Sequence, residues 1–165
     1  MPVTIQSDKI SSGTIKLLPL GYVQSILATA AAPATTGAND IYQMVKLASN
    51  AALTSGDGSS TGGPTITGVA LGTDALDGAS SLTLDVGDSG SAARYLSAST
   101  IGRAGGRVGS TLASSLGYQP FATPTFATYT TASLQTYLIQ VKVNASAATA
   151  LAGNIRLLVD FTIDP

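Results

Sequence analysis

Apolar and polar side chains alternate most strictly near the C-terminus of the chain. One predicted strand places five apolar side chains on a single face: Ile155, Leu157, Val159, Phe161 and Ile163. A second predicted strand repeats the pattern with Tyr137, Ile139, Val141 and Val143. A period of two residues is typical of a half-buried β-strand.

The same period recurs in shorter segments upstream. Leu82, Leu84 and Val86 are predicted to point inward, with Ser81, Thr83 and Asp85 outward. Further strands are predicted at residues 41–47, where Ile41, Val45 and Leu47 share a face, and at residues 65–71 and 95–100. Seven or eight short strands with turn residues between them predict an all-β fold, an antiparallel β-sandwich or jelly roll.

The first part of the chain has a different pattern. Val3 and Ile5 alternate as in a strand, but residues 28–37 form an Ala/Thr/Pro run without periodicity. We therefore predict an extended N-terminal arm and linker over residues 1–38 and a β-sandwich body over residues 39–165.

Two segments leave more than one interpretation open. Residues 22–30 could form a short helix instead of part of the linker, and residues 111–118 fit either a helical turn or a strand. The Gly/Ser/Thr-rich residues 54–64 predict a long exposed loop whose role the sequence does not define.

The composition indicates a surface with unusually few charged residues. Half of the chain is Ala, Gly, Ser and Thr, and only 10% of residues are charged, against about 25% in typical soluble domains. Such a surface is tolerable if much of it lies in permanent contacts. The net charge of −1 offers no basic face for nucleic acid. Arg103 and Arg107 are predicted to lie in a glycine-rich surface loop.

The chain lacks the side chains of most catalytic sites. It has no Glu, His, Cys or Trp, which excludes histidine-based triads and the usual zinc ligands. Asp88-Ser-Gly90 matches the core of an aspartic-protease motif, but a simple turn explains those three residues equally well. We expect a protein that is not an enzyme, with no catalytic residues, no cofactor and no small-molecule substrate.

Four aspartates in turn-rich sequence are candidate oxygen ligands for calcium: Asp74, Asp77, Asp85 and Asp88. The spacing of an EF-hand loop is absent, and aspartates also end strands and form Asx-turns. We therefore predict no metal site and leave cation binding by these residues open.

The N-terminus lacks the basic and apolar regions of a secretory signal, and no apolar stretch is long enough to span a bilayer. The sequon Asn144-Ala-Ser146 then has no secretory context. We expect a protein that is assembled inside a cell and has no membrane partner.

A succession of short segments resembles one known family. These segments are residues 40–46, 69–77, 81–88, 94–95, 117–119 and 153–164. Together they are similar to the small structural proteins of tailed bacteriophages that decorate, or cement, the capsid. The likeness covers about residues 40 to 164, and the insertion at residues 54–64 departs from it.

The resemblance implies a β-sandwich seated on the major capsid protein across capsomer boundaries, often as a homotrimer. It also implies a location on the outer surface of the virion, after assembly in the cytoplasm of a bacterial host. An extended arm can add a strand to a neighbour's sheet, so residues 1–38 are predicted to clasp the capsid or a sister subunit.

Other functions fit the same sequence. One is a tail, neck or fibre component of a virion, and another is a host- or carbohydrate-binding module on a sandwich scaffold. The four residues Tyr118, Phe121, Phe126 and Tyr129 could either fill the core or dock on such a partner.

Overall fold

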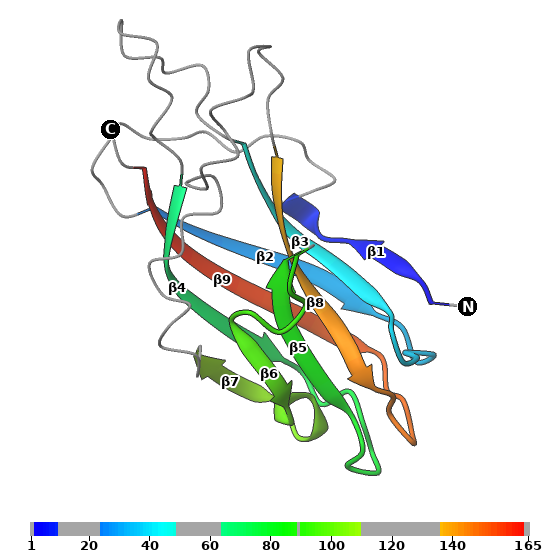
Figure 1. The fold of residues 1–165 in the computed structure, drawn as a ribbon. Helices are drawn as coiled ribbons and strands as arrows, with labels where there is room; N and C mark the ends of the chain where they lie inside the picture. Colours follow the sequence, from blue (N-terminus) through cyan, green and yellow to red (C-terminus); the bar gives the residue numbers. More distant parts are fainter. Residues whose placement is uncertain (1, 10–23, 49–63, 89, 110–135, 164–165) are drawn as a thin grey trace, which may run out of the picture.

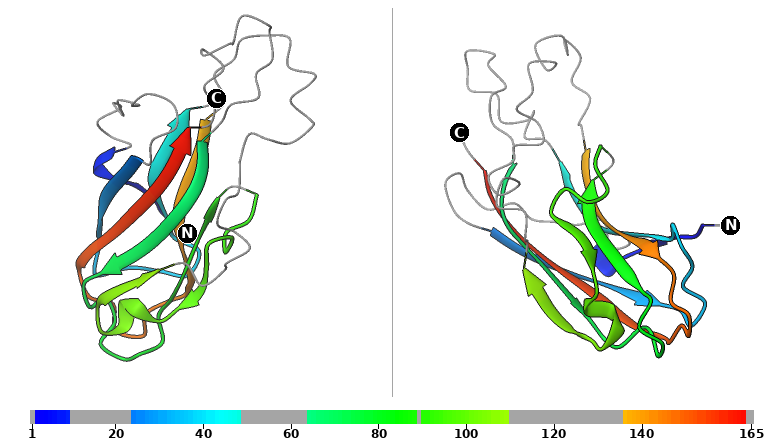
Figure 2. Two further views of the ribbon diagram at one scale, coloured as in Figure 1. Left: turned by 90° about the vertical axis from the view of Figure 1, so that its left-hand side faces the viewer. Right: turned by 60° about the horizontal axis from the view of Figure 1, so that its bottom comes forward.

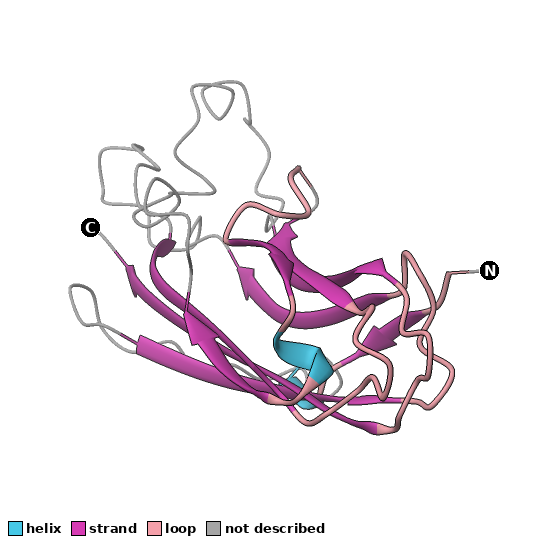
Figure 3. Ribbon diagram, turned by 90° about the horizontal axis from the view of Figure 1, so that it is seen from below, coloured by secondary structure: helices cyan, strands magenta, loops and turns pink. Residues whose placement is uncertain are grey.

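The computed structural model describes residues 2–9, 24–48, 64–88, 90–109 and 136–163. These residues form nine β-strands in two sheets that face each other, with one short 3-10 turn. Figure 1 shows the strands as two layers, and the view from below in Figure 3 separates them. The predicted all-β antiparallel sandwich is confirmed.

The first sheet, here called sheet A, has five strands. Its central strand β8 pairs antiparallel with β3 and β5, while β1 adds to β3 in the parallel direction. The strands in spatial order are β1 (Thr4–Gln6), β3 (Ile41–Ala48), β8 (Thr136–Ala145), β5 (Thr83–Asp88) and β6 (Leu96–Ser99).

The second sheet, sheet B, has four strands, all paired antiparallel. The strands in spatial order are β2 (Gln24–Ala32), β9 (Gly153–Ile163), β4 (Pro64–Thr73) and β7 (Gly106–Gly109). The 3-10 turn η1 (Ile101–Arg103) lies between β6 and β7, where the chain passes from sheet A to sheet B.

The core lies between the two sheets and consists of the apolar faces that the alternation predicted. Sheet B contributes the fully buried Ile155, Leu157, Val159 and Phe161 of β9. Sheet A contributes the fully buried Leu84 and Val86 of β5 with Ile139, Val141 and Val143 of β8. Since β8 and β9 bury every second residue, the residues between these core positions lie on the outer faces.

The prediction of a linker is wrong for residues 24–32, which form the nine-residue strand β2, and so is the helical alternative for this segment. Strand β2 pairs along its whole length with β9. Its inner face is Ile26 followed by Ala28, Ala30 and Ala32, all buried. Buried alanines do recur at every second position of β2. The positions between them include alanine and threonine, so the sequence shows no clear apolar and polar alternation. The small methyl groups suit a thin core.

The predicted inner face of β3 is also wrong in part. A bulge between Gln43 and Val45 shifts the register, so that both Met44 and Val45 are buried. The shift places Tyr42 inside, while Ile41 stays partly exposed. An extra residue of this kind reverses which side chains face the core on either side of it.

Several predictions fall outside the described residues: the segments 54–63 and 111–118 and the aromatic residues Tyr118, Phe121, Phe126 and Tyr129. Within the described part of the chain, no helix is long and apolar enough to cross a membrane.

We predict that leucine-to-alanine substitutions on the inner and outer faces of sheet B differ in their effect on the free energy of unfolding. Leu157→Ala leaves a cavity beneath β9, so we expect the free energy of unfolding to fall by about 2–5 kcal/mol. Leu27→Ala removes a side chain that is 53% exposed and should change it by no more than about 0.5 kcal/mol. Urea denaturation of both variants checks this. Equal losses would contradict the assignment of the core.

Candidate functional site

The N-terminal segment, residues 2–9, lies beside β3 at the edge of sheet A. Asp40, which is buried just before β3, accepts hydrogen bonds from the backbone N–H of Val3 at 2.8 Å and of Gly37 at 2.7 Å. The Ile41 N–H donates to the Val3 carbonyl at 2.8 Å, which begins the parallel pairing of β1 with β3. One carboxylate thus ties the N-terminal segment to the loop between β2 and β3.

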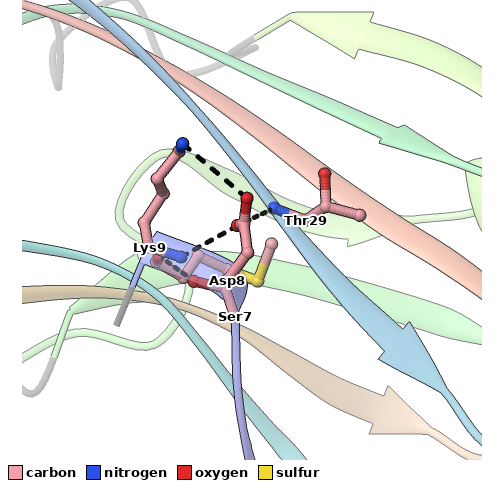
Figure 4. A network of polar contacts seen from close by, with 5 residues as sticks. Ser7, Asp8, Lys9 and Thr29 are labelled. Carbon is pink, nitrogen blue, oxygen red and sulfur yellow. Dashed lines mark hydrogen bonds and ion pairs between the residues drawn. The ribbon is translucent and has the colours of Figure 1, made fainter. Parts of the chain in front are cut away.

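The end of this segment joins the two sheets. Ser7 is fully buried, and its hydroxyl donates to the Met44 carbonyl of β3 in sheet A. The next residue, Asp8, accepts a hydrogen bond from the backbone N–H of Thr29 on β2 in sheet B at 2.7 Å. Figure 4 shows the Asp8 carboxylate between Thr29 and Lys9. Residues 7 and 8 therefore connect the edges of both sheets.

Strand β1 leaves the edge of sheet A exposed. Its backbone pairs with β3 through Val3 and Ser7, so the N–H and C=O groups of Thr4 and Gln6 point away from β3. No described residue forms a backbone hydrogen bond with these outward groups. The edge carries no charged residue or proline within β1, which suits the addition of a strand from a partner.

The four candidate calcium ligands each have separate local partners. Asp77 is buried and accepts bonds from four backbone N–H groups, those of Ala79, Ser81, Leu82 and Thr149, at 2.6–3.3 Å. It thereby ties the loop after β4 to the loop after β8. Asp74 pairs with Arg156 at 2.8 Å and accepts a bond from the Asn154 side chain at 2.9 Å.

The other two aspartates both lie on strand β5 of sheet A. Asp88 accepts bonds from the backbone of Gly90 and Ser91 and forms an ion pair with Arg94. This is a turn, the simpler of the two interpretations of Asp88-Ser-Gly90. Asp85 was predicted to point outward, and it lies opposite the core, but it is buried and accepts a hydrogen bond from the Ala98 backbone N–H at 2.7 Å.

Among the described residues, no three acidic side chains come together as a metal site would require. Asp77 and Asp88 instead accept hydrogen bonds from the backbone of their own turns, as Asx-turns do. Asp74 and Asp85 accept backbone hydrogen bonds from other strands, from Asn154 of β9 and Ala98 of β6.

Of the two arginines predicted to lie in a glycine-rich loop, Arg107 lies in strand β7. Arg103 lies in η1 and donates through Nε to the Leu82 carbonyl at 3.0 Å.

The pKa values of two aspartates follow from these contacts. Burial opposes ionisation of Asp77, but its four backbone N–H donors outweigh burial and lower its pKa far below the ordinary value. Hydrogen bonds from Arg156, then from Asn154, lower the pKa of Asp74. Both carboxylates are therefore charged at neutral pH and act as fixed anchors.

Comparison with known proteins supports one class of function. No protein-family model matches the sequence, and no curated protein sequence matches it significantly. A chain of the capsid of Ralstonia phage GP4 is similar, with a TM-score of 0.71 and 26% identity over 97% of both chains. A chain of the cyanophage Pam1 capsid asymmetric unit has a TM-score of 0.63 and 25% identity over 93% of this chain and 96% of its own. These likenesses support a structural role in a phage virion.

The Asp77 anchor predicts a specific dependence of stability on pH. Because folding lowers the pKa of Asp77, its contribution is complete above the unfolded value of about 3.9 and is lost as the pH falls below it. Asp77→Asn should lower the melting temperature at pH 7 by several degrees. The difference from the wild type should narrow as the pH falls from about 5 to about 2.

Thermal melts of both proteins across this pH range measure the effect. Since the other aspartates are the same in both proteins, the difference isolates Asp77. A difference in melting temperature that is the same at every pH would contradict the stabilising role of the Asp77 carboxylate.

Proposed function

We propose that this chain decorates a phage head and stabilises it by binding the major capsid protein across capsomer boundaries. The observation that carries the proposal is the likeness to a chain of the Ralstonia phage GP4 capsid, which extends over 97% of both chains. The proposed location is the outer surface of the capsid, with assembly in the host cytoplasm.

The chemistry of the surface supports this role. Binding across a boundary needs area, shape and backbone hydrogen bonds, and it needs no catalytic group. Threonine, serine and alanine let two surfaces approach closely with little loss of side-chain entropy. The proposed function is accordingly not enzymatic, and it involves no cofactor, membrane or nucleic acid.

Strand β1 is the proposed point of attachment. The outward backbone groups of Thr4 and Gln6 allow a strand of the capsid protein to extend sheet A. The N-terminal clasp is therefore narrower than residues 1–38, because β2 belongs to the body. A homotrimer would bring three such edges to one threefold position of the shell, as the family resemblance implies.

The clasp is tested by deleting residues 2–9 and measuring occupancy on capsids that lack this chain. We expect the eight remaining strands to fold, with a lower melting temperature, because the deletion removes the hydrogen bonds of Ser7 and Asp8 but only the partly buried Ile5 from the edge of the hydrophobic core. Circular dichroism checks the fold, and co-sedimentation with capsids measures occupancy. Occupancy should fall by at least about tenfold, and a truncated protein that still saturates capsids would refute the clasp.

A point variant separates strand addition from the loss of the whole segment. Gln6→Pro removes an N–H that points away from β3, so the pairing within sheet A is retained. It should reduce occupancy while leaving the melting temperature nearly unchanged. Gln6→Ala is the matched control and should bind normally. Equal capsid occupancy by Gln6→Pro and Gln6→Ala would contradict strand addition at β1.

A further inference from the structure

The outer face of sheet B differs from an ordinary solvent-exposed sheet. At its centre Leu27, Leu158 and Ala70 lie level with one another on β2, β9 and β4. Leu27 is 53% exposed, and the other two are partly exposed. The left view of Figure 2 shows β9 and β4 in front, with no described segment lying over them.

Two polar rows lie on either side of this apolar row. The first row lies two residues from the apolar row on each strand and consists of Thr29, Arg156 and Gly72. On the other side are Ser25, Asp160 and Gly68. Along β9 the face therefore presents the cation Arg156, then the apolar row, then the anion Asp160.

Local contacts hold the two charged side chains in place. Arg156 pairs with Asp74, and its side chain remains 42% exposed. Asp160 accepts a bond from the Ser25 hydroxyl at 2.6 Å and lies against Gly68, where a Cβ would come within 3.0 Å of its Oδ2. The two residues are four positions apart on an extended strand, about 13 Å, so they do not pair with each other.

The outer face of sheet A has a different character. There Gln6, Gln43 and Gln140 form a level row across β1, β3 and β8. Lys46 and Lys142 lie on the same face, each level with a partly exposed apolar residue, Leu138 and Ile41 respectively. Amide and ammonium groups of this kind are typical of a surface that remains in water, whereas the Leu27–Leu158 row is not.

The order of the rows on sheet B is self-complementary. A twofold axis that lies across the strands at Leu158 sets β9 antiparallel to β9 of a second copy. Leu158 then faces Leu158, and Arg156 of each copy faces Asp160 of the other. The same rotation sets Leu27 against Leu27, Thr29 against Ser25 and Gly72 against Gly68, so that no like charges of these rows meet.

We propose that the outer face of sheet B is a contact surface for a second copy of this chain, related by this twofold axis. The three long strands span a face about 15 Å wide and about 30 Å long. That area is below the roughly 800 Å² per partner of standard complexes. The contact is therefore weak between free molecules and strengthened where many copies are held close together on a shell.

The proposal is independent of capsid decoration, because it is tested with the free protein. Arg156→Asp makes the face acidic and Asp160→Arg makes it basic, so each variant repels its own copies. When the two variants are mixed, both facing pairs become Asp–Arg. We expect each variant alone to associate at least about tenfold more weakly than the wild type, and the equimolar mixture to form a dimer at least as tightly as the wild type does.

Sedimentation velocity up to about 1 mM detects association in the range expected for so small a face. Lys46→Asp on sheet A is the matched control, since it changes the net charge as Arg156→Asp does. Its mixture with Asp160→Arg should show no such gain. A mixture of Arg156→Asp and Asp160→Arg that stays monomeric, or a control mixture that associates equally, would overturn the proposal.

A second pair of variants covers the case in which Arg156→Asp fails to fold beside Asp74. Leu158 faces itself across the axis, so Leu158→Asp and Leu158→Lys should each be monomeric and should associate when mixed. Failure of this mixture to associate would also overturn the proposal. Loss of capsid binding with this self-association intact would instead count against the proposed function alone.

Discussion

The packing of one sheet's inner face against the other holds this molecule together. Of the eight pairs of consecutive described strands, seven lie in different sheets, and only β5 and β6 are neighbours within one sheet. Local hairpins therefore stabilise little of the chain, and the cohesion comes from the facing inner surfaces of the two sheets, to which β8 and β9 both contribute. The aspartate anchors depend on this packing, because Asp77 joins loops that meet only when the sheets do.

Hydrophobic alternation predicted the strands whose inner faces are large. Strands β5, β8 and β9 lie where Leu, Ile, Val and Phe recur every second residue. Strand β2 was missed because its inner face is mostly alanine, whose small side chain gives little hydrophobic contrast with neighbouring threonine. The bulge in β3 was also beyond the pattern, since a one-residue shift depends on the pairing with β8.

The candidate site was less accessible to sequence reasoning. The turn interpretation of the aspartates could be made from Asp, Gly and Ser alone, and the structure gives each its backbone donors. The role of Asp40 depends on a partner 37 positions away and has no local signal except its place after Gly37. The rows on sheet B likewise require the register of three strands. Together these features describe a protein with distinct surfaces: an edge for strand addition, a polar face and a self-complementary face.

The central claim is that this sandwich is a bridging component on the outside of a phage head. Cryo-electron microscopy of capsids incubated with the purified chain tests it most directly. The account predicts regular density for the sandwich on the outer surface, spanning capsomer boundaries, with β1 against the shell. Capsids without added density, or density confined to a tail or neck, would contradict it.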